Sequence, residues 1–359
     1  MRPPERVLFL YKRCPQGRDL LSRPYGRFYH LARELAARGC AVHVATLSYR
    51  GLPSIATTFD GVSWSGDDLW PSGPLAYLRR LRRLAETLRP DWVIGVSDTW
   101  FGILASRFAA QTGARCAIDA YDNFEAYIPW ARPLHGLWRN ALCRADLVSA
   151  AGPQLAARLI ETGANACEVL PMAADPAFIP IDPRRARAAL GLPADRLLIG
   201  HLGAFNRSRG HTVLLEGLRA LQERNPRVAL ILSGRDSLPF HAPPRIFGLG
   251  YLDDAQMPLL VNALDVACVS LADNAFGHYS YPAKLCEAMA CGVPVVATDT
   301  GPTRWMLNNE SRFLAPLGDA DTLRKRLEAN LDLGRVHYPG LQSWTAIAGR
   351  LIDALTARA

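Results

Sequence analysis

A lysine and a glutamate in the second half of the chain have the spacing of a ligand-binding pair. Lys284 and Glu287 are three residues apart in the segment 280–298, which reads as a helix followed by a buried strand, and residues three apart share one helix face. Lys284 falls in the first turn, where the helix dipole and free N–H groups favour an anion. Glu287 lies one turn deeper and can accept hydrogen bonds from a diol. The pair suits a ligand that carries both phosphate and ribose; a surface ion pair is the alternative interpretation.

A second segment, 203–210, has the form of an anion-binding loop. It lies between a predicted strand and a predicted helix and contains Gly203, Arg207 and Arg209. Glycines let the backbone approach a ligand, N–H groups at a helix start point toward it, and guanidinium forks suit phosphate oxygens. The segment matches neither the Gly-x-Gly-x-x-Gly fingerprint nor a Walker loop. An ordinary loop with solvent-facing arginines is the alternative interpretation.

Short apolar runs alternate with helical segments along most of the chain, which predicts parallel sheets covered by helices. Four prolines within 171–185 interrupt this alternation and indicate a linker between two α/β halves. The predicted strands are 7–10, 40–47, 91–96, 115–120, 147–150, 168–170, 197–202, 228–233, 245–248, 266–270 and 293–297. The predicted helices are 27–38, 75–89, 101–112, 137–144, 154–162, 212–224, 257–263, 282–290, 322–331 and 341–358.

Length and composition are those of a globular protein. The 359 residues are 49% hydrophobic and 21% charged, which excludes disorder, coiled coil and collagen and predicts two domains or one large one. Apolar runs fall far short of the roughly 20 residues that a membrane helix needs, and the N-terminus lacks an apolar signal segment, so a cytoplasmic protein is expected. The eight cysteines form no Cys-x-x-Cys pair, which predicts reduced thiols rather than a zinc site.

The positive charge comes almost entirely from arginine. The net charge is +8, with three lysines and 38 arginines. The segment 75–89 places leucines at helical spacing beside Arg79, Arg80, Arg82 and Arg83. It predicts either a surface helix with a solvated cationic face or a patch that contacts anionic lipid on the inner face of a membrane. Nucleic-acid-binding motifs are absent from the sequence, so no nucleic acid partner is expected.

The segment 284–298 resembles the donor-site signature of glycosyltransferase family 4, whose members are retaining, nucleotide-sugar-dependent enzymes with the GT-B fold. Further segments resemble, in chain order, the first acceptor-domain helix, the end of the first domain, the crossing into the second, the phosphate loop and the base-pocket loop: 25–39, 145–149, 169–176, 206–210 and 249–252. The resemblance spans nearly the whole chain and is most specific over 280–298.

This resemblance implies two Rossmann-like domains facing across a cleft: an acceptor-binding domain over 1–172, a donor-binding domain over 173–338, and a helix over 339–359 that returns to the first. It implies donor contacts from Gly203, Arg207, Arg209, Gly234, Tyr251, Tyr281, Lys284 and Glu287. It implies acceptor-side contacts from Tyr25, Gly26, Tyr121 and Asn123, and catalytic roles for Asp122, Glu287 and Arg207. Asp98 is a further candidate by position. No metal or other cofactor is expected, since cationic side chains stabilise the leaving phosphate.

The implied reaction is transfer of a sugar from a nucleoside diphosphate to a glycan, lipid-linked or small-molecule acceptor in cell-surface polysaccharide or glycolipid biosynthesis. Two positions depart from the family pattern. The first of two family glutamates is replaced by Asn274, or by Tyr279 if residues are counted back from Glu287, and Tyr121 stands where a histidine is frequent. An inactive nucleotide-sugar-binding scaffold and a GT-B-like epimerase therefore stay open as alternatives.

Overall fold

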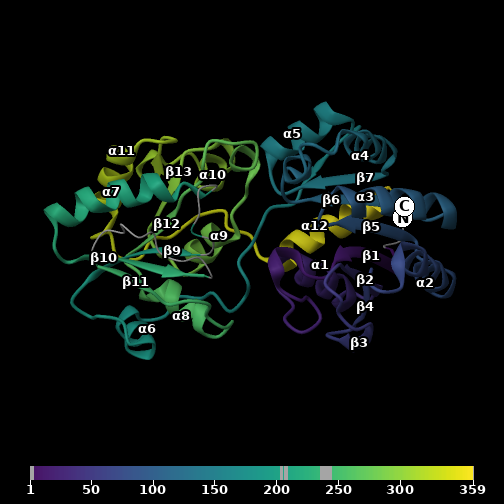
Figure 1. Cartoon of the computed structure of the whole chain (residues 1–359), viewed down its shortest axis with the longest axis horizontal. Coiled ribbons are helices and arrows are strands. Elements are labelled where there is room, and N and C mark those ends of the chain that lie inside the picture. Colours follow the sequence, from purple (N-terminus) through teal and green to yellow (C-terminus); the bar gives the residue numbers. More distant parts are fainter. Residues whose placement is uncertain (1–3, 203–204, 206–208, 235–244, 359) are drawn as a thin grey trace. The chain divides into compact units, whose positions relative to one another are not determined.

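The chain forms two compact α/β units. A computed structural model describes residues 4–202, 205, 209–234 and 245–358. One unit comprises residues 1–171 and 342–359, and the other comprises residues 172–341 (Figure 1). Each has its own, mainly parallel sheet, so the predicted fold class of two Rossmann-like α/β domains is confirmed. Within the described part of the chain, no helix combines the length and apolar character needed to cross a membrane.

The sheet of the first unit has the strand order β3-β4-β2-β1-β5-β6-β7-β8. The strands are β1 Arg6–Lys12, β2 Ala41–Ser48, β3 Ile55–Phe59, β4 Val62–Asp68, β5 Trp92–Val96, β6 Arg115–Ala120, β7 Leu147–Ala150 and β8 Glu168–Val169. The helices are α1 Gly26–Ala37, α2 Gly73–Leu88, α3 Thr99–Thr112, α4 Arg132–Arg144, α5 Pro153–Thr162 and α12 Trp344–Ala357. Strand β5 is buried along its whole length, as expected for a parallel strand covered on both faces.

The hairpin β3–β4 at the sheet edge was not predicted from the sequence. Strand β4 pairs in parallel with β2, whereas β3 pairs with β4 antiparallel. Asp60 and Gly61 connect them with φ of 51° and 75°, the positive values that two-residue hairpin turns require. Buried and half-buried residues alternate along β4, because β4 lies near the edge and one of its faces is only partly covered.

The C-terminal helix α12 packs on α1 of the first unit, which confirms the predicted return to that domain. The rings of His30 and Trp344 stack with centres 5.6 Å apart and planes 11° apart. Arg38 donates a hydrogen bond of 2.7 Å to the carbonyl oxygen of Thr345. Ser343 caps the start of α12 by accepting the N–H of Ala346.

The sheet of the second unit has the strand order β11-β10-β9-β12-β13-β14, and every pairing in it is parallel. The strands are β9 Leu197–Leu202, β10 Val228–Ser233, β11 Ile246–Gly248, β12 Val266–Val269, β13 Val295–Thr298 and β14 Leu314–Ala315. The helices are α6 Pro183–Leu190, α7 His211–Arg224, α8 Gln256–Ala263, α9 Ala283–Ala290, α10 Gly301–Met306 and α11 Ala320–Asn330.

Each sheet has a switch point, where successive strands begin to add on the other side of the first strand. It lies between β1 and β5 in the first unit and between β9 and β12 in the second. In open parallel sheets, ligands bind outside the carboxyl ends of the strands at such a point. The fold therefore singles out the segments that follow β1, β5, β9 and β12.

Candidate functional site

Lys284 and Glu287 lie on one face of α9, as their spacing predicts. The Lys284 Nζ atom is 2.8 Å from Oε2 of Glu287 and 3.2 Å from Oε1. The Glu287 side chain is only 12% exposed, whereas that of Lys284 is 36% exposed. Helix α9 follows the loop after β12, so its first turn lies at the carboxyl edge of the second sheet. The helix thus holds a nearly buried acid beside a cation next to the switch point.

Arg209 connects the two loops that flank the switch point of the second unit. Its guanidinium carbon lies 4.7 Å from the centre of the Phe276 ring, within cation–π range. Its carbonyl oxygen accepts a hydrogen bond of 2.6 Å from the Ser270 hydroxyl. Arg209 precedes α7, and both partners follow β12. The predicted donor residues Gly203 and Arg207 lie outside the described residues.

The other predicted donor residues lie on neighbouring segments of the second unit. The N–H of Gly234 donates to the carbonyl oxygen of Gly250 over 2.8 Å, which ties the loop after β10 to the loop after β11. Tyr251 follows in the second loop and is 51% exposed. Tyr281 is buried instead, with its ring edge-on to Trp305 at a centre separation of 5.9 Å. Gly234 and Tyr251 therefore belong to edge loops, and Tyr281 to the packed start of α9.

Asn274, one of the two positions predicted to replace the family glutamate, shapes the loop before α9. Its Oδ1 atom accepts the N–H groups of Phe276 at 3.0 Å and Gly277 at 2.8 Å. His278 follows in the same loop, and its Nε2 atom lies 2.6 Å from Oδ1 of Asp273 at the surface. The amide oxygen of Asn274 thus has a structural role that a short side-chain acceptor serves well.

The predicted acceptor-side residues Tyr25 and Gly26 lie at the start of α1. The Tyr25 hydroxyl donates to the carbonyl oxygen of Pro15 over 2.9 Å, and the Arg18 guanidinium carbon lies 4.3 Å from the centre of the Tyr25 ring. Gly26 has a φ of +55°, and a Cβ atom there would meet nothing within 4 Å. The backbone conformation rather than crowding therefore favours glycine at this position.

The predicted residues Tyr121, Asp122 and Asn123 directly follow β6. The Tyr121 hydroxyl donates to the carbonyl oxygen of Ser97 over 3.1 Å, and burial followed by the nearby Asp122 raises the pKa of Tyr121. Asp122 is 8% exposed, and its Oδ2 atom accepts a hydrogen bond of 2.6 Å from the Tyr127 hydroxyl. The Asp122 carboxylate is thus nearly buried and held by a donor from the same loop.

One aromatic residue brings the two acceptor-side segments together. The Phe28 ring on α1 packs edge-on against Tyr25 at 5.8 Å and against Tyr121 at 5.3 Å. These segments are almost a hundred residues apart in the sequence. They meet because β1 and β6 flank β5 in the sheet. The structure therefore gathers the predicted acceptor-side residues at one edge of the first unit.

The switch point of the first unit adds Lys12 and Ser97, which the sequence did not indicate, beside the predicted candidate Asp98. The N–H of Lys12, the last residue of β1, donates to the Ser97 hydroxyl over 3.2 Å. Ser97 is buried and has a φ of +90°, a conformation that non-glycine residues rarely adopt. Asp98 then caps α3 by accepting the N–H groups of Trp100 and Phe101. Burial raises the pKa of Asp98, and the nearby Lys12 opposes that rise.

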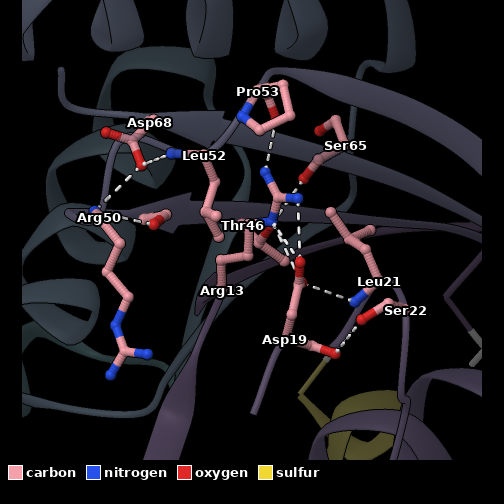
Figure 2. A network of polar contacts seen from close by, with 11 residues as sticks. Arg13, Asp19, Leu21, Ser22, Thr46, Arg50, Leu52, Pro53, Ser65 and Asp68 are labelled. Carbon is pink, nitrogen blue, oxygen red and sulfur yellow. Dashed lines mark hydrogen bonds and ion pairs between the residues drawn. The ribbon is translucent and has the colours of Figure 1, made fainter. Parts of the chain in front are cut away.

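Buried polar contacts hold the loops after β1 and β2 together (Figure 2). Arg13 is 4% exposed, and its NH2 atom pairs with Oδ2 of Asp19 at 3.0 Å, while its NH1 atom donates to the carbonyl oxygen of Pro53 at 2.7 Å. Asp68 at the end of β4 accepts the N–H groups of Arg50 and Leu52. These contacts give both loops a defined conformation at the sheet edge.

The basic segment forms helix α2, with Arg79, Arg82 and Arg83 exposed. Arg80 instead pairs with Asp67 at 2.6 Å. The expected leucine stripe is only partly buried: Leu81 packs inward, whereas Leu75 is 66% exposed. Leu75 lies in the first turn of α2, and the residues of α2 that are buried, Tyr77, Leu81 and Ala85, all lie beyond it. The helix therefore presents cations and one apolar side chain on its outer surface.

Metal-ligating groups do not gather within the described residues: no cluster of three or more His, Cys, Asp or Glu side chains could hold an ion there. An Asp-x-Asp sequence at 319–321 belongs to α11, where Asp319 caps the helix and Asp321 pairs with Arg324 and Lys325. All eight cysteines are free thiols, as their scattered spacing predicts.

Two family models match this chain over consecutive ranges. The model described as "Glycosyl transferase 4-like domain" matches residues 26–173. The model described as "Glycosyl transferases group 1" matches residues 196–332. The first range lies within the first unit but for its last two residues, and the second lies within the second unit. Together the two matches span most of the sequence.

Relatives with glycosyltransferase names agree with the family that these two models describe. A D-inositol 3-phosphate glycosyltransferase of Saccharomonospora viridis is 29% identical over 204 residues, which are 49% of this chain and 46% of the relative. A phosphatidyl-myo-inositol mannosyltransferase of Mycobacterium leprae is 33% identical over 168 residues, 42% of this chain and 44% of the relative. The chain thus matches less than half the length of each.

The fold is similar to that of a solved structure over almost its full length. Anabaena HepE in complex with UDP-glucose superimposes with a TM-score of 0.69 at 17% identity, covering 98% of this chain and 95% of that one. At this identity the likeness concerns the fold. With both family models matched in order and both α/β units present, the chain belongs to the family 4-like glycosyltransferases of the GT-B fold.

Proposed function

We propose that this protein is a retaining glycosyltransferase. It moves a sugar from a nucleoside-diphosphate sugar to a glycan, lipid-linked or small-molecule acceptor in polysaccharide or glycolipid biosynthesis, at the cytoplasmic face of the membrane. The observation that carries the proposal is the nearly buried Glu287 beside Lys284 in the first turns of α9. It agrees with the glycosyltransferase names of the relatives and with the UDP-glucose in the HepE structure.

In this proposal the second unit binds the donor. Lys284 and the N-terminal turn of α9 contact the diphosphate, together with Arg209 and Arg207 from the loop after β9. Glu287 accepts hydrogen bonds from the ribose hydroxyls, and Gly234 and Tyr251 contact the base from the edge loops. As the glycosidic bond breaks, negative charge develops on the leaving phosphate, and fixed cations stabilise it without a metal ion.

The first unit then binds the acceptor. Tyr25, Gly26, Tyr121 and Asn123 surround its reacting end, and Asp122 faces the transferred sugar. The hydrogen bond from Tyr127 fixes the orientation of the Asp122 carboxylate before the substrate arrives. Such preorganisation lowers the cost of aligning the reacting groups. Because these side chains contact the acceptor, their identities determine which acceptor the protein uses.

The test begins by naming the donor. Thermal-shift measurements with uridine, guanosine, adenosine and thymidine diphosphate sugars should show one base that raises the melting temperature, since a ligand stabilises the state that binds it. Glu287→Gln should then weaken donor binding and transfer about 10- to 100-fold, since a hydrogen bond to a charged group contributes about 1.5–3 kcal/mol.

The matched control is Glu223→Gln, the same change at an exposed position near the end of α7. It should leave donor affinity and transfer unchanged. The proposal fails if Glu287→Gln is folded and transfers sugar at the wild-type rate, or if no nucleotide sugar shifts the melting temperature.

A second candidate function is a nucleotide-sugar-binding scaffold without transferase activity. The observation that favours it is Asn274, whose amide oxygen accepts backbone N–H groups of the loop; neither Asn274 nor Tyr279, the two positions that can correspond to the family glutamate, is an acid. Calorimetry that detects donor binding, combined with no donor hydrolysis and no transfer to any acceptor, would support the scaffold. Detectable slow donor hydrolysis would exclude it.

Anionic lipid is the proposed surface partner of helix α2. Exposed Arg79, Arg82 and Arg83 can contact phosphate headgroups while Leu75 and the 66% exposed Trp70 enter the interface. Each cation near a charged surface contributes about 1 kcal/mol. Replacing the three arginines by glutamine should therefore abolish flotation with phosphatidylglycerol vesicles. Equal flotation of the variant would refute this role.

A further inference from the structure

Several acids at the carboxyl edge of the first sheet have close partners. Asp19 pairs with Arg13 at 3.0 Å, and Asp67 pairs with Arg80 at 2.6 Å. Asp68 accepts backbone N–H groups of the loop after β2. The charges of these carboxylates are therefore offset within the fold, and none of them needs a further cation.

Two cationic side chains at the same edge, Lys12 and Arg50, have no such close ionic partner in the described part of the chain. Within the described residues, neither Lys12 nor Arg50 forms an ion pair with a carboxylate. Lys12 is half-buried and Arg50 is exposed. Figure 2 shows the Arg50 side chain turned away from Asp68, which contacts only its backbone. The Asp98 carboxylate lies near enough to Lys12 to interact with its charge but forms no ion pair with it, so both cations can still bind an anion from outside.

Lys12 and Arg50 lie at the ends of neighbouring, paired strands. Lys12 ends β1 and Arg50 follows β2, whose Leu47 lies opposite Lys12 in the pairing. Both act on the thiol of Cys14: burial and then Asp19 raise the pKa of Cys14, and Arg50, Arg13 and Lys12 oppose the rise. Two cations that form no ion pair with any described residue therefore lie on neighbouring segments at the carboxyl edge of the sheet, and Lys12 borders the switch point.

The other side of the switch point offers a hydrogen-bond acceptor. Asp98 follows β5, and the Lys12 N–H bonded to Ser97 fixes the spacing between the two strand ends. The left-handed φ of Ser97 sets the direction in which the chain leaves β5, and strain of this kind is frequent at binding sites. Asp98 keeps a carboxylate near Lys12 while its backbone contacts hold it in place.

We propose that Lys12 and Arg50 bind a phosphate group of the acceptor, and that Asp98 accepts a hydrogen bond from a hydroxyl of the same molecule. The proposal rests on the proposed function and narrows it to phosphorylated acceptors. A phosphate matches two separate cations better than a neutral sugar does, because charge-assisted hydrogen bonds form to both. The phosphate belongs either to a soluble acceptor or to a lipid headgroup.

Calorimetry on the full chain tests the phosphate contacts. It is done in a saturating concentration of the nucleoside diphosphate that the thermal-shift screen identifies, so that the donor site is occupied. We expect binding of inorganic phosphate and of sn-glycerol 3-phosphate. Lys12→Met and Arg50→Met should each weaken both about tenfold. Arg107→Met removes one exposed arginine of α3 and should leave both affinities within twofold. Wild-type affinity in the folded Lys12→Met/Arg50→Met double variant would overturn the proposal.

Asp98→Asn separates a ligand contact from helix capping, because asparagine caps a helix as well as aspartate does. It should weaken glycerol 3-phosphate several-fold and leave inorganic phosphate unchanged, since only the former carries alcohol hydroxyls beyond its phosphate group. Loss of both, or of neither, would overturn the role of Asp98.

Vesicles containing phosphatidic acid distinguish the two phosphate sources. Each binding is compared with that of the Lys12→Met/Arg50→Met variant. If the wild type binds glycerol 3-phosphate more tightly but vesicles no better, the acceptor is soluble. If it binds vesicles more tightly but glycerol 3-phosphate no better, the phosphate belongs to a lipid. Binding of neither overturns the proposal. Donor-induced thermal shifts are read separately, so a failed donor site and a failed phosphate site give different results.

Discussion

Arg27 and Asp119 form a buried ion pair in the first unit, at 2% and 3% exposure. The guanidinium meets both carboxylate oxygens, at 2.6 Å and 2.5 Å. Its third nitrogen donates to the carbonyl oxygens of Leu170 and Pro171, and the Ser149 hydroxyl donates to Asp119. Leu170 and Pro171 are the last residues before the chain enters the second unit, so the pair anchors the point of departure.

Asp119→Asn keeps the side-chain volume but leaves the guanidinium charge without a counter-ion. Removing one partner of a buried pair costs about 3–5 kcal/mol, because the remaining charge stays buried. For a unit of this size, each kcal/mol lowers the melting temperature by about 2–4 °C, which gives a fall of about 6–20 °C. Urea unfolding followed by tryptophan fluorescence reports on this unit, since seven of the eight tryptophans lie in it.

The matched control is Asp91→Asn, whose pair with Arg6 has side chains 36% and 40% exposed. Solvent screens such a pair, so the change should cost about 1 kcal/mol or less. The reasoning is refuted if Asp119→Asn loses no more stability than Asp91→Asn. A shift in Asp119→Asn confined to the fluorescence of Trp305, which lies in the second unit, would also contradict it.

Three further predictions concern the same unit. Gly26→Ala should cost about 1 kcal/mol through its positive φ alone, since a Cβ there meets no atom; an unchanged urea midpoint would contradict this. Burial alone would raise the pKa of Asp68, but hydrogen bonds, first from the Trp70 and Leu52 N–H groups, lower it to about 2, below its ordinary 3.8. The stability that the Asp68 carboxylate contributes should therefore be fully present above about pH 4 and be lost as the pH falls toward 2. Urea midpoints measured against pH should fall less steeply for Asp68→Asn than for the wild type; parallel slopes would refute this. Tyr127→Phe removes the hydrogen bond from the Tyr127 hydroxyl to the Asp122 carboxylate and should lower kcat several-fold with donor KM unchanged, as steady-state kinetics can check; an unchanged kcat would show that this hydrogen bond does not serve catalysis.

Local pattern was sufficient wherever the relevant neighbours are close in the chain. The α/β class followed from apolar runs alternating with helical segments, and the shared face of Lys284 and Glu287 followed from helical periodicity. The helix that returns to the first unit was expected from the family resemblance. The hairpin β3–β4 was missed because its strands are partly exposed, so they lack the continuous apolar run by which buried strands were recognised.

Contacts between residues that are far apart in the chain could not be predicted from the sequence. The contacts of Phe28 with Tyr25 and Tyr121, and the hydrogen bond from Lys12 to Ser97, depend on which strands lie side by side. The partners of Asp98 and Asn274 show that both side chains also support the local backbone.

Spacing along the chain thus sufficed for the secondary-structure class and for the cation–acid pair of α9, because a helix relates residues only three or four positions apart. The tertiary fold alone decided which strand ends meet at each switch point, because strand order arises from packing whole elements together. It also decided that Arg13, Asp19 and Asp68 have polar partners within the fold, whereas Lys12 and Arg50 form no ion pair within the described residues and can contact a ligand, since charge pairing depends on distance in space.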